Sequence, residues 1–592
     1  MRRTSRATRV QREQRRARRM QVRIRVVFVL TAMVLSLFAA RLVQLQGVDA
    51  AAYASMAADE RNRTVELHAE RGVIRDRNGE ELATSVDGVA LTADPTMTAA
   101  DAPAIAAVLW RIAGLDYFDT VAALRTPDTR FVWLERQVPA WEAERVLRAL
   151  SKDRLTGVFT LRDPYRTYPA GDVAGNVLGF LDVDGNGIAG LEAVADEQLR
   201  GRDGVETYMV AGNGAQIPLT PSSLDEPEQG TGLELTLDRD LQWYAQRRLQ
   251  QAIRDTGASS GTVVVTHVRT GQVLSLAEWP TVDPNRPEAV DKPDRGSRAV
   301  QNVYEPGSVQ KLLTFAALLE EDRIRPRTRL TVPPSLVFDD ARVRDWFPHG
   351  TIRLTATGAL AQSSNLGVIK AAQGFRGSEL EPYLRAFGLG AETGIGLPGE
   401  SRGILYPASE WLDITRANIL FGQGLSVTAV QMASAVNAIA NHGTYVAPSL
   451  VLGAVGPDGA TVPVEKAERH RVVSRAAAGQ VAAMMEEAVT APAGTAEAAA
   501  IPGYRVAGKT GTSQRVTDAG GYDPNQTVVS FAGFAPADDP RFSAYIVLDN
   551  PAPGVGGGSG AGPVFHDVMA YTLQRYAVAP TRDRSPPLPS RW

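Results

Sequence analysis

The stretch Tyr304-Glu305-Pro306-Gly307-Ser308-Val309-Gln310-Lys311 runs directly into the apolar segment 312–319. Its proline and glycine are turn residues, and the segment after them is hydrophobic nearly all round, which predicts a helix buried in a core. Ser308 then lies at the N-terminus of that helix, and Lys311 lies one turn later on the same face. A lysine in an apolar site can lose its charge and act as the base that activates a serine hydroxyl. The alternative is a helix cap followed by a solvated lysine, and Ser-x-x-Lys on its own favours this alternative.

Length and composition limit what the rest of the chain can be. A chain of 592 residues is too long for a single core, so we expect two or more domains. Hydrophobic residues make up 44% and charged residues 22%, which is the composition of an ordinary globular protein. The absence of cysteine excludes disulfides, thiol catalysis and cysteine-ligated metal sites. The six histidines show no metal-ligand spacing, so the sequence indicates neither a metal nor a cofactor.

The N-terminal region has the pattern of a membrane anchor. Residues 1–25 form a basic tail with eleven Arg and one Glu, and residues 26–45 are almost wholly apolar. A spanning helix needs roughly 20 apolar residues, and arginines at its ends can snorkel. The arginines predict a cytoplasmic N-terminus in the cell (inner) membrane, with the chain from residue 46 onward in the periplasm or outside the cell. Dense arginine is also typical of nucleic-acid binding, but the apolar run that follows favours the membrane and no nucleic acid.

A cleavable signal peptide is the alternative to an anchor. Cleavage after Ala40 or Ala39 would place Phe38 or Leu37 at the third position upstream, where a small residue is required. We therefore expect an uncleaved, single-pass anchor.

Residues 46–230 have the pattern of a structural or interaction module, because nothing in them pairs a nucleophile with a base. Asn78-Gly79 between two short extended segments predicts a β-hairpin. Residues 100–155 are rich in alanine and predict helices. Three tryptophans are expected to pack in this part: Trp110, Trp133 and Trp141. The polar stretch Ser222–Gly230 predicts a linker.

Residues 231–580 begin and end with strand patterns and are mainly helical between them. The strands are expected at 262–266, 272–276, 504–508, 528–534 and 543–548. This order predicts an α+β fold, in which an antiparallel sheet is covered by helices and an all-helical subdomain is inserted between its parts. Residues 581–592 are expected to form a flexible tail.

Two further motifs follow Ser308-x-x-Lys311 in the chain. The first is Gln362-Ser363-Ser364-Asn365, and the second is Gly508-Lys509-Thr510-Gly511-Thr512 at the end of a predicted strand. Each alone has the pattern of a cap, a turn or a strand end. All three in this order are the signature of penicillin-binding proteins and class A β-lactamases, which have Asp where this chain has Ser364. The match at the second motif therefore depends on Ser363 and Asn365.

The chain resembles the class B penicillin-binding proteins, and within them the division-type (FtsI) branch. The residues that carry the resemblance are Arg71-Gly72-x-Ile74-x-Asp76-Arg77-Asn78-Gly79, Gly190-Leu191-Glu192, Tyr304–Ser308, Phe421-Gly422-Gln423-Gly424 and Lys509–Thr512. The resemblance implies that residues 46–230 form an elongated, β-rich, non-catalytic pedestal (dimerisation) domain. It also implies that residues 231–580 form a transpeptidase domain similar to serine β-lactamases. Val309-Gln310 departs from the family pattern, and we expect it to affect packing only.

The resemblance also implies the chemistry of the site. The substrate would be a peptidoglycan stem peptide that ends in D-Ala-D-Ala. Ser308 would attack the carbonyl between the two D-Ala residues and form an acyl-enzyme, with neutral Lys311 as the base. Ser363 would pass the proton toward the leaving amine, supported electrostatically by Lys509. Asn365 would bind the substrate backbone and Lys311.

Substrate binding would fall to the third motif and to two backbone groups. The resemblance implies that Lys509, Thr510 and Thr512 bind the terminal carboxylate, and that Gly511 lets the substrate strand approach. The backbone N–H groups of Ser308 and Thr512 would form the oxyanion hole. An amine from a neighbouring stem peptide would then resolve the acyl-enzyme into a cross-link. β-Lactam antibiotics would acylate Ser308.

Several alternatives remain within this chemistry. An elongation-type class B transpeptidase would use the same residues, although the compact region before the transpeptidase domain favours the septal type. A membrane-anchored serine β-lactamase would lack the long region before residue 231. The resemblance implies an FtsW-type glycan polymerase and other divisome proteins as partners. The glycine-rich stretch Gly556–Gly560 lacks the Lys of a phosphate-binding loop and is expected to be a flexible loop near the site.

Overall fold

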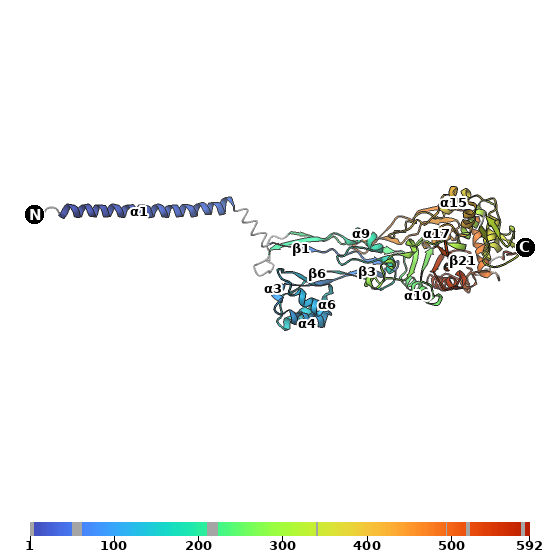
Figure 1. Cartoon of the computed structure of the whole chain (residues 1–592), viewed down its shortest axis with the longest axis horizontal. Coiled ribbons are helices and arrows are strands. Elements are labelled where there is room, and N and C mark those ends of the chain that lie inside the picture. Colours follow the sequence, from blue (N-terminus) through green and yellow to red (C-terminus); the bar gives the residue numbers. More distant parts are fainter. Residues whose placement is uncertain are drawn as a thin grey trace. The chain divides into compact units, whose positions relative to one another are not determined.

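The computed structural model describes residues 5–49, 62–209, 223–338, 341–492, 494–516, 521–581 and 587–592 (Figure 1). The chain divides into two units. The first comprises Met1–His68 and Asp203–Glu228, and the second comprises Ala69–Arg202 and Gln229–Trp592.

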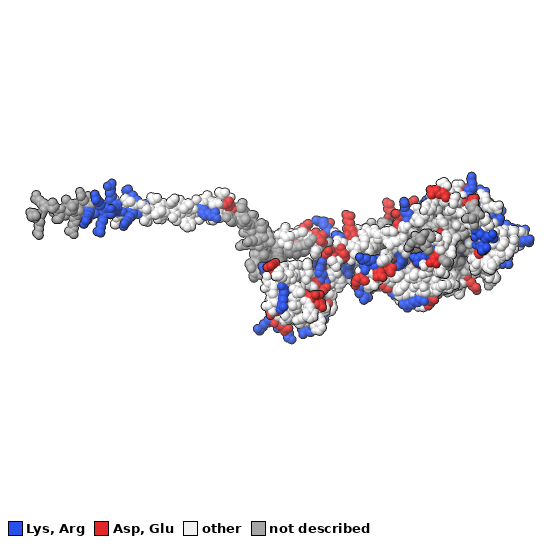
Figure 2. All heavy atoms as spheres, in the orientation of Figure 1, with Lys and Arg blue, Asp and Glu red and all other residues white. Residues whose placement is uncertain are grey.

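The first unit contains a long N-terminal helix and a small sheet. Helix α1 (Ser5–Val43) continues into a π-helical turn, Gln44–Val48. Within the described residues, one helix is long and apolar enough to cross a membrane, at Arg15–Val48, and it includes the predicted anchor. Figure 2 shows the arginines of its first part as a dense band, followed by a length without charged side chains.

The sheet of the first unit corrects one prediction. Its strands are β1 (Asn62–Leu67), β8 (Gly204–Met209) and β9 (Ser223–Asp225), in the order β1-β8-β9. Strand β9 lies inside the stretch predicted as a linker and pairs antiparallel with Val205–Thr207. That prediction is therefore wrong for these three residues. Local polarity does not reveal an extended segment that pairs with a neighbouring strand.

A six-stranded sheet in the second unit crosses the predicted domain boundary at residue 230. Its order is β19-β18-β10-β2-β3-β7. The strands are β2 (Ile74–Arg75), β3 (Glu81–Val86), β7 (Tyr165–Thr167), β10 (Gly232–Leu235), β18 (Val451–Val455) and β19 (Thr461–Pro463). Strands β2 and β3 form the predicted hairpin around Asn78-Gly79. Strand β10 pairs with β2 on one side and with β18 on the other, so one sheet joins residues from both predicted domains.

A small α/β subdomain follows the hairpin. Its sheet has the order β5-β4-β6, and helices cover one face. Its elements are β4 (Gly88–Ala93), α3 (Pro95–Thr98), α4 (Ala102–Ala113), α5 (Tyr117–Ala123), β5 (Val132–Pro139), α6 (Ala140–Lys152) and β6 (Val158–Arg162). The prediction that three tryptophans pack here is wrong. Trp110, Trp133 and Trp141 are 61%, 49% and 58% exposed, because smaller residues such as Ile105, Leu109 and Val146 fill the core.

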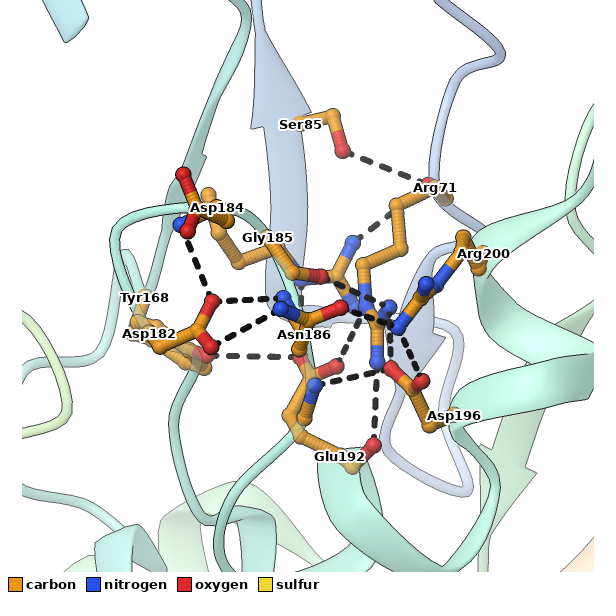
Figure 3. Close-up of polar contacts among 12 residues, drawn as sticks. Arg71, Ser85, Tyr168, Asp182, Asp184, Gly185, Asn186, Glu192, Asp196 and Arg200 are labelled. Atoms are coloured by element: carbon orange, nitrogen blue, oxygen red, sulfur yellow. Dashed lines mark hydrogen bonds and ion pairs between the residues drawn. The ribbon is translucent and has the colours of Figure 1, made fainter. Parts of the chain in front are cut away.

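A buried ionic cluster connects the two motifs quoted from the non-catalytic region (Figure 3). Glu192, on α8 (Gly190–Val194), is fully buried and accepts hydrogen bonds from Arg71 Nε at 2.7 Å and Arg166 Nε at 2.8 Å. Arg71 also pairs with Asp196 on α9 (Asp196–Arg200) at 2.8 Å. Figure 3 shows the Arg71 guanidinium between these two carboxylates. The cluster fixes the start of the hairpin against helices about 120 residues later in the sequence.

Residues 231–580 are built on a five-stranded antiparallel sheet in the order β12-β11-β23-β22-β21. The strands are β11 (Ser260–His267), β12 (Val273–Trp279), β21 (Ala507–Val516), β22 (Tyr522–Ala535) and β23 (Phe542–Asp549). Successive side chains of β11 enter different cores. Val263 packs with α10 (Arg239–Thr256) and α19 (Gly562–Arg575), whereas Val264 belongs to the core that contains α12 (Lys311–Glu320) and α17 (Ala429–Ala440).

The predicted all-helical subdomain contains strands as well as helices, so that prediction is wrong in this respect. Its helices are α13 (Ala356–Ala361), α14 (Asn365–Ala371), α15 (Gly377–Ala386) and α16 (Asp413–Phe421). Between α12 and α13 lie two small hairpins, β13 (Arg329–Val332) with β16 (Ile352–Thr355), and β14 (Leu336–Phe338) with β15 (Ala341–Val343). Pro333-Pro334 prevents a helix here, because proline lacks the N–H that a helix interior needs.

The remaining described elements are α7 (Gly175–Leu178), α11 (Arg298–Gln301), β17 (Thr444–Val446), β20 (Arg469–Arg471) and α18 (Arg475–Thr490), with short 3₁₀ or π turns between them. Helix α18 packs in the same core as α12.

The C-terminal segment corrects the prediction of a flexible tail at 581–592. Residues 582–586 lie outside the described residues, but 587–592 pack against the subdomain. Thr355 N donates to Ser590 O at 3.1 Å, and the Trp592 ring lies against the guanidinium groups of Arg329 and Arg353. The indole and these backbone contacts fix the end of the chain beside α13.

We predict that Glu192→Gln destabilises the protein by about 3–5 kcal/mol, because it leaves two buried arginine side chains without their shared carboxylate. The thermal unfolding midpoint of the full chain in detergent should fall clearly. The matched control is Glu144→Gln, which breaks an exposed i,i+4 pair with Arg148. Equal midpoints for the two variants would contradict a stabilising role for the cluster.

Candidate active site

Ser308 lies in a short turn, here named the catalytic turn, that immediately precedes the predicted helix. Residues Gly307–Gln310 form a 3₁₀ turn, and α12 starts at Lys311. Positions i and i+3 eclipse each other in a 3₁₀ turn, so Ser308 and Lys311 share one face as expected. Ser308 is partly exposed, while Gly307 and Val309 beside it are buried. The predicted buried helix is confirmed, since every residue from Lys311 to Leu319 is buried.

Glycines hold the catalytic turn against strand β21. Gly307 has φ +53, and its N–H donates to Gly422 O at 3.0 Å. A Cβ on Gly307 would lie 2.5 Å from Thr512 O, which is closer than Cβ atoms approach other heavy atoms. Only glycine permits this approach of the turn to the strand. The Phe421–Gly424 motif therefore forms the turn behind Ser308.

Lys311 is fully buried and bonded to the second motif. Its Nζ donates to Ser363 O at 2.7 Å and to Asn365 Oδ1 at 2.8 Å, and lies 3.3 Å from Ser363 Oγ. Burial lowers the pKa of Lys311 to about 7, although Asp345 opposes part of this shift. A large share of Lys311 is therefore the free base at neutral pH, which is the form that can accept a proton.

Ser363 connects the two buried lysines. It follows α13 with φ +58, a backbone conformation that costs a residue with a side chain about 1–3 kcal/mol. The backbone there is held by N–H donation from Ser363 to Leu360 O and from Ser364 to Ala359 O. In this conformation Ser363 Oγ lies 3.3 Å from Lys311 Nζ and 2.9 Å from Lys509 Nζ.

Lys509 is equally buried, on β21. Its Nζ donates to Ser363 Oγ at 2.9 Å and to Thr510 O at 2.9 Å. Burial and the neighbouring Lys311 hold the pKa of Lys509 well below its usual range. A positive charge on either of these two lysines therefore disfavours a positive charge on the other.

The remaining predicted residues lie on the same strand. Thr510 Oγ1 donates to Thr495 Oγ1 at 3.0 Å, while Thr512 is exposed and donates to Gly511 O at 2.8 Å. A Cβ on Gly511 would meet Ser530 Oγ at 2.2 Å and Val309 Cγ2 at 3.0 Å. Gly511 therefore makes room for the protein's own side chains, whereas the prediction was that it makes room for the substrate strand. Val309, which had no assigned role, packs against it.

The glycine-rich stretch lies near the site, as expected, but it is not an irregular loop. Gly557–Ala561 form a π-helical turn before α19. A Cβ on Gly557 would lie 2.5 Å from both Gly511 O and Ser530 O, so this turn packs against the middle of β21. The expectation of a flexible loop is wrong for these residues.

Two carboxylates whose contacts the sequence did not predict, Glu305 and Asp345, support the site. Glu305 Oε1 accepts from Gly424 N at 2.7 Å and from Tyr522 OH at 3.0 Å, and Glu305 O accepts from Ser513 Oγ at 2.7 Å. Asp345 is buried beside the second motif and accepts from Ser364 Oγ at 2.6 Å. The sequence offers no spacing signal for either contact. Within the described residues, no group of three or more His, Asp or Glu side chains is placed to hold a metal ion.

Comparison with known families matches both halves of the chain. The penicillin-binding protein transpeptidase domain matches residues 261–570, and the penicillin-binding protein dimerisation domain matches residues 66–235. The chain is 35% identical to PbpB of Mycolicibacterium smegmatis over 590 residues, with 94% of this chain and 90% of PbpB covered. It is 33% identical to the peptidoglycan D,D-transpeptidase FtsI of Escherichia coli over 525 residues, with 88% and 86% covered.

The fold matches solved structures of the same family. Penicillin-binding protein 3 of Mycobacterium tuberculosis complexed with ampicillin superposes with a TM-score of 0.70 at 32% identity, over 89% of this chain and all of that one. Its complex with aztreonam gives the same values.

The chain belongs to the class B penicillin-binding proteins. This class B penicillin-binding protein is of the division type, and its enzymatic activity is that of a serine-type D,D-transpeptidase of peptidoglycan. The α+β fold expected from the sequence is confirmed, with an N-terminal apolar helix, a dimerisation domain and a transpeptidase domain.

Proposed function

We propose that Ser308 is the nucleophile of this transpeptidase and that Lys311 is its base. What supports this is the geometry of one hydroxyl, Ser363 Oγ, within 3.3 Å of two buried lysines, next to a partly exposed serine on a turn. Ser308 Oγ attacks the carbonyl carbon between the two D-Ala residues, and its proton passes to the free-base Nζ of Lys311.

The leaving group takes the same proton. As the C–N bond breaks, the D-Ala amine receives the proton from Lys311 through Ser363 Oγ, which lies between the lysines. Asn365 holds Lys311 in place through its Oδ1 at 2.8 Å. The developing oxyanion binds to the backbone N–H groups of Ser308 and Thr512. The acceptor amine then attacks the ester carbonyl and loses a proton to Lys311. As the ester bond breaks and the amide cross-link forms, Lys311 returns this proton to Ser308 Oγ.

Carboxylate binding favours the charged form of Lys509. Burial and the neighbouring Lys311 both lower the pKa of Lys509. The terminal carboxylate of the stem peptide brings a negative charge to Lys509, Thr510 and Thr512, which favours the charged form. Gly511 allows the catalytic turn and β21 to pack closely enough for both sets of groups to meet one substrate.

We further propose that α1 anchors the enzyme in the cell (inner) membrane, with its basic N-terminal tail in the cytoplasm and residues 46–592 outside. The arginine band ahead of the apolar length of α1 supports this orientation. The partners are an FtsW-type glycan polymerase and other divisome proteins, and the enzyme acts at the division septum. An elongation role is the alternative.

Labelling with a fluorescent penicillin tests the nucleophile. The wild-type chain in detergent should form a covalent adduct that survives denaturing electrophoresis, and Ser308→Ala should reduce labelling to background because no acyl ester can form. The control is Ser378→Ala on the exposed side of α15, which should label like the wild type. A Ser308→Ala variant that labels normally would show that the nucleophile is a different residue.

Acylation should slow as pH falls through about 7, because burial lowers the pKa of Lys311 to that value and protonation below it removes the base. Well below the pKa, the rate constant should fall about tenfold per pH unit. Time courses of penicillin labelling on either side of this pH measure the rate constant, and the final amplitude measures the active fraction. A rate constant that does not change with pH would contradict Lys311 as the base.

Depletion of the protein in its host distinguishes septal from elongation function. Cells that lack a septal transpeptidase continue to elongate without dividing, so we expect filaments. Round cells would instead assign the enzyme to elongation. Re-expression of the Ser308→Ala variant should leave the filaments, while Ser378→Ala should restore division.

A further inference from the structure

A segment that belongs to none of the three motifs reaches the active site. Residues 344–351 connect β15 to β16, and the side chain of Asp345 in this segment is fully buried. The Asp345 carboxylate has three polar partners, which are Ser364 Oγ at 2.6 Å, Leu366 N at 2.9 Å and His349 Nε2 at 3.0 Å. Two of these partners, Ser364 and Leu366, lie in or next to the second motif, and the third, His349, lies in the segment itself.

The segment makes further hydrogen bonds to the second motif. Besides the contacts of Asp345, Trp346 Nε1 donates to Gln362 O at 3.0 Å, and Asn365 Nδ2 donates to Arg344 O at 3.1 Å. Three consecutive residues, 344–346, therefore hold the backbone or side chains of residues 362, 364, 365 and 366. The strained φ of Ser363 lies in the middle of this set.

These contacts determine how Asn365 meets the catalytic lysine. Because its Nδ2 donates to Arg344 O, the amide presents Oδ1 to Lys311 Nζ at 2.8 Å. Ser364 caps α14, accepting from Gly367 N at 2.8 Å while its own hydroxyl donates to Asp345. The chain from Asp345 through Ser364 and Asn365 thus ends at the base of the reaction.

His349 is the third polar partner of Asp345. Its Nε2 faces Asp345 Oδ2, and its Nδ1 faces the carbonyl of Gly350. The carboxylate oxygen is a hydrogen-bond acceptor, so Nε2 donates to Asp345. The pair is almost wholly buried, which makes its geometry well defined.

We propose that Asp345 and His349 are positioning residues for acylation, holding Ser363 and Asn365 so that Lys311 can take the proton of Ser308. This inference rests on the proposed roles of Ser308 and Lys311. Ser364 occupies the place where the related β-lactamase motif has an aspartate. In this chain the carboxylate comes from Asp345 instead, and Ser364 is its hydrogen-bond donor.

The charged groups around Lys311 give the inference a distinctive readout. Asp345 is the carboxylate that raises the pKa of Lys311 against the effect of burial, and the Lys509 amine faces Lys311 from β21. Removing the charge at Asp345 therefore lowers the pKa of Lys311 further. The acid limb of the acylation profile should move to lower pH, while the plateau rate falls because Asn365 no longer holds Lys311.

Asp345→Asn tests this with the full chain and a fluorescent penicillin. The plateau rate constant of acylation should fall about 10-fold to 100-fold, the cost of disrupting a buried charge-assisted contact. The labelled amplitude should stay close to that of the wild type. The matched control is Asp94→Asn, a capping aspartate in the small α/β subdomain that accepts from Thr96 N at 2.9 Å. The control should leave both the rate constant and its pH profile unchanged.

His349 provides a second pair of variants. Gln at this position can still donate to Asp345, whereas Ala cannot, so His349→Gln should retain more of the acylation rate than His349→Ala. If Asp345→Asn does not fold, this pair still decides the question.

The outcomes separate the two proposals. Normal rate constants with unshifted pH profiles in the Asp345→Asn and His349→Ala variants would overturn the positioning role and leave the Ser308 assignment standing. A loss of labelled amplitude with an unchanged rate constant would show a purely structural role and would also overturn it. Labelling that does not depend on Ser308 would overturn the proposed function and this inference together.

Discussion

Two lysines buried around one serine hydroxyl set the requirements for the rest of the transpeptidase domain. Ammonium groups are costly to bury, so burying Lys311 and Lys509 at 3.3 Å and 2.9 Å from Ser363 Oγ lowers the pKa of both and requires hydrogen-bond acceptors around their amines. The apolar helix α12 excludes water on one side and strand β21 on the other. The same exclusion of water gives Lys311 its basicity near neutral pH.

Close packing of the catalytic turn on β21 follows from that requirement. Gly307 and Gly511 lie where a Cβ would overlap the opposite backbone or a neighbouring side chain, and Gly557 packs against β21 from the other side. Three glycines from distant parts of the sequence therefore bring the turn, the strand and α19 together. A Cβ on Gly307 or Gly557 would meet backbone atoms, which cannot move aside, whereas a Cβ on Gly511 would meet mainly the side chains of Ser530 and Val309.

The sequence predicted the parts of the site that lie on regular elements with local signals. Ser308, Lys311, Ser363, Asn365 and Lys509 are found in motifs whose spacing is visible in the chain, and the sheet is visible from alternating strands. It did not predict contacts between distant segments. The pairing of β10 with β2, the burial of Glu192 between Arg71 and Arg166, and the packing of Trp592 all depend on tertiary structure. The prediction that three tryptophans pack in the core was wrong for a related reason, since hydrophobicity alone does not say which face of a helix or sheet meets the core.

Asp345 shows why a short motif does not contain the whole site. A carboxylate next to the second motif can come from the motif itself or from any segment that the fold brings there, and the chemistry depends only on its position. In this chain, a hairpin inserted before α13 brings Asp345 to 2.6 Å from Ser364 Oγ. The connection from β15 to β16 thereby reaches the start of α14, where Asp345 also accepts from Leu366 N at 2.9 Å.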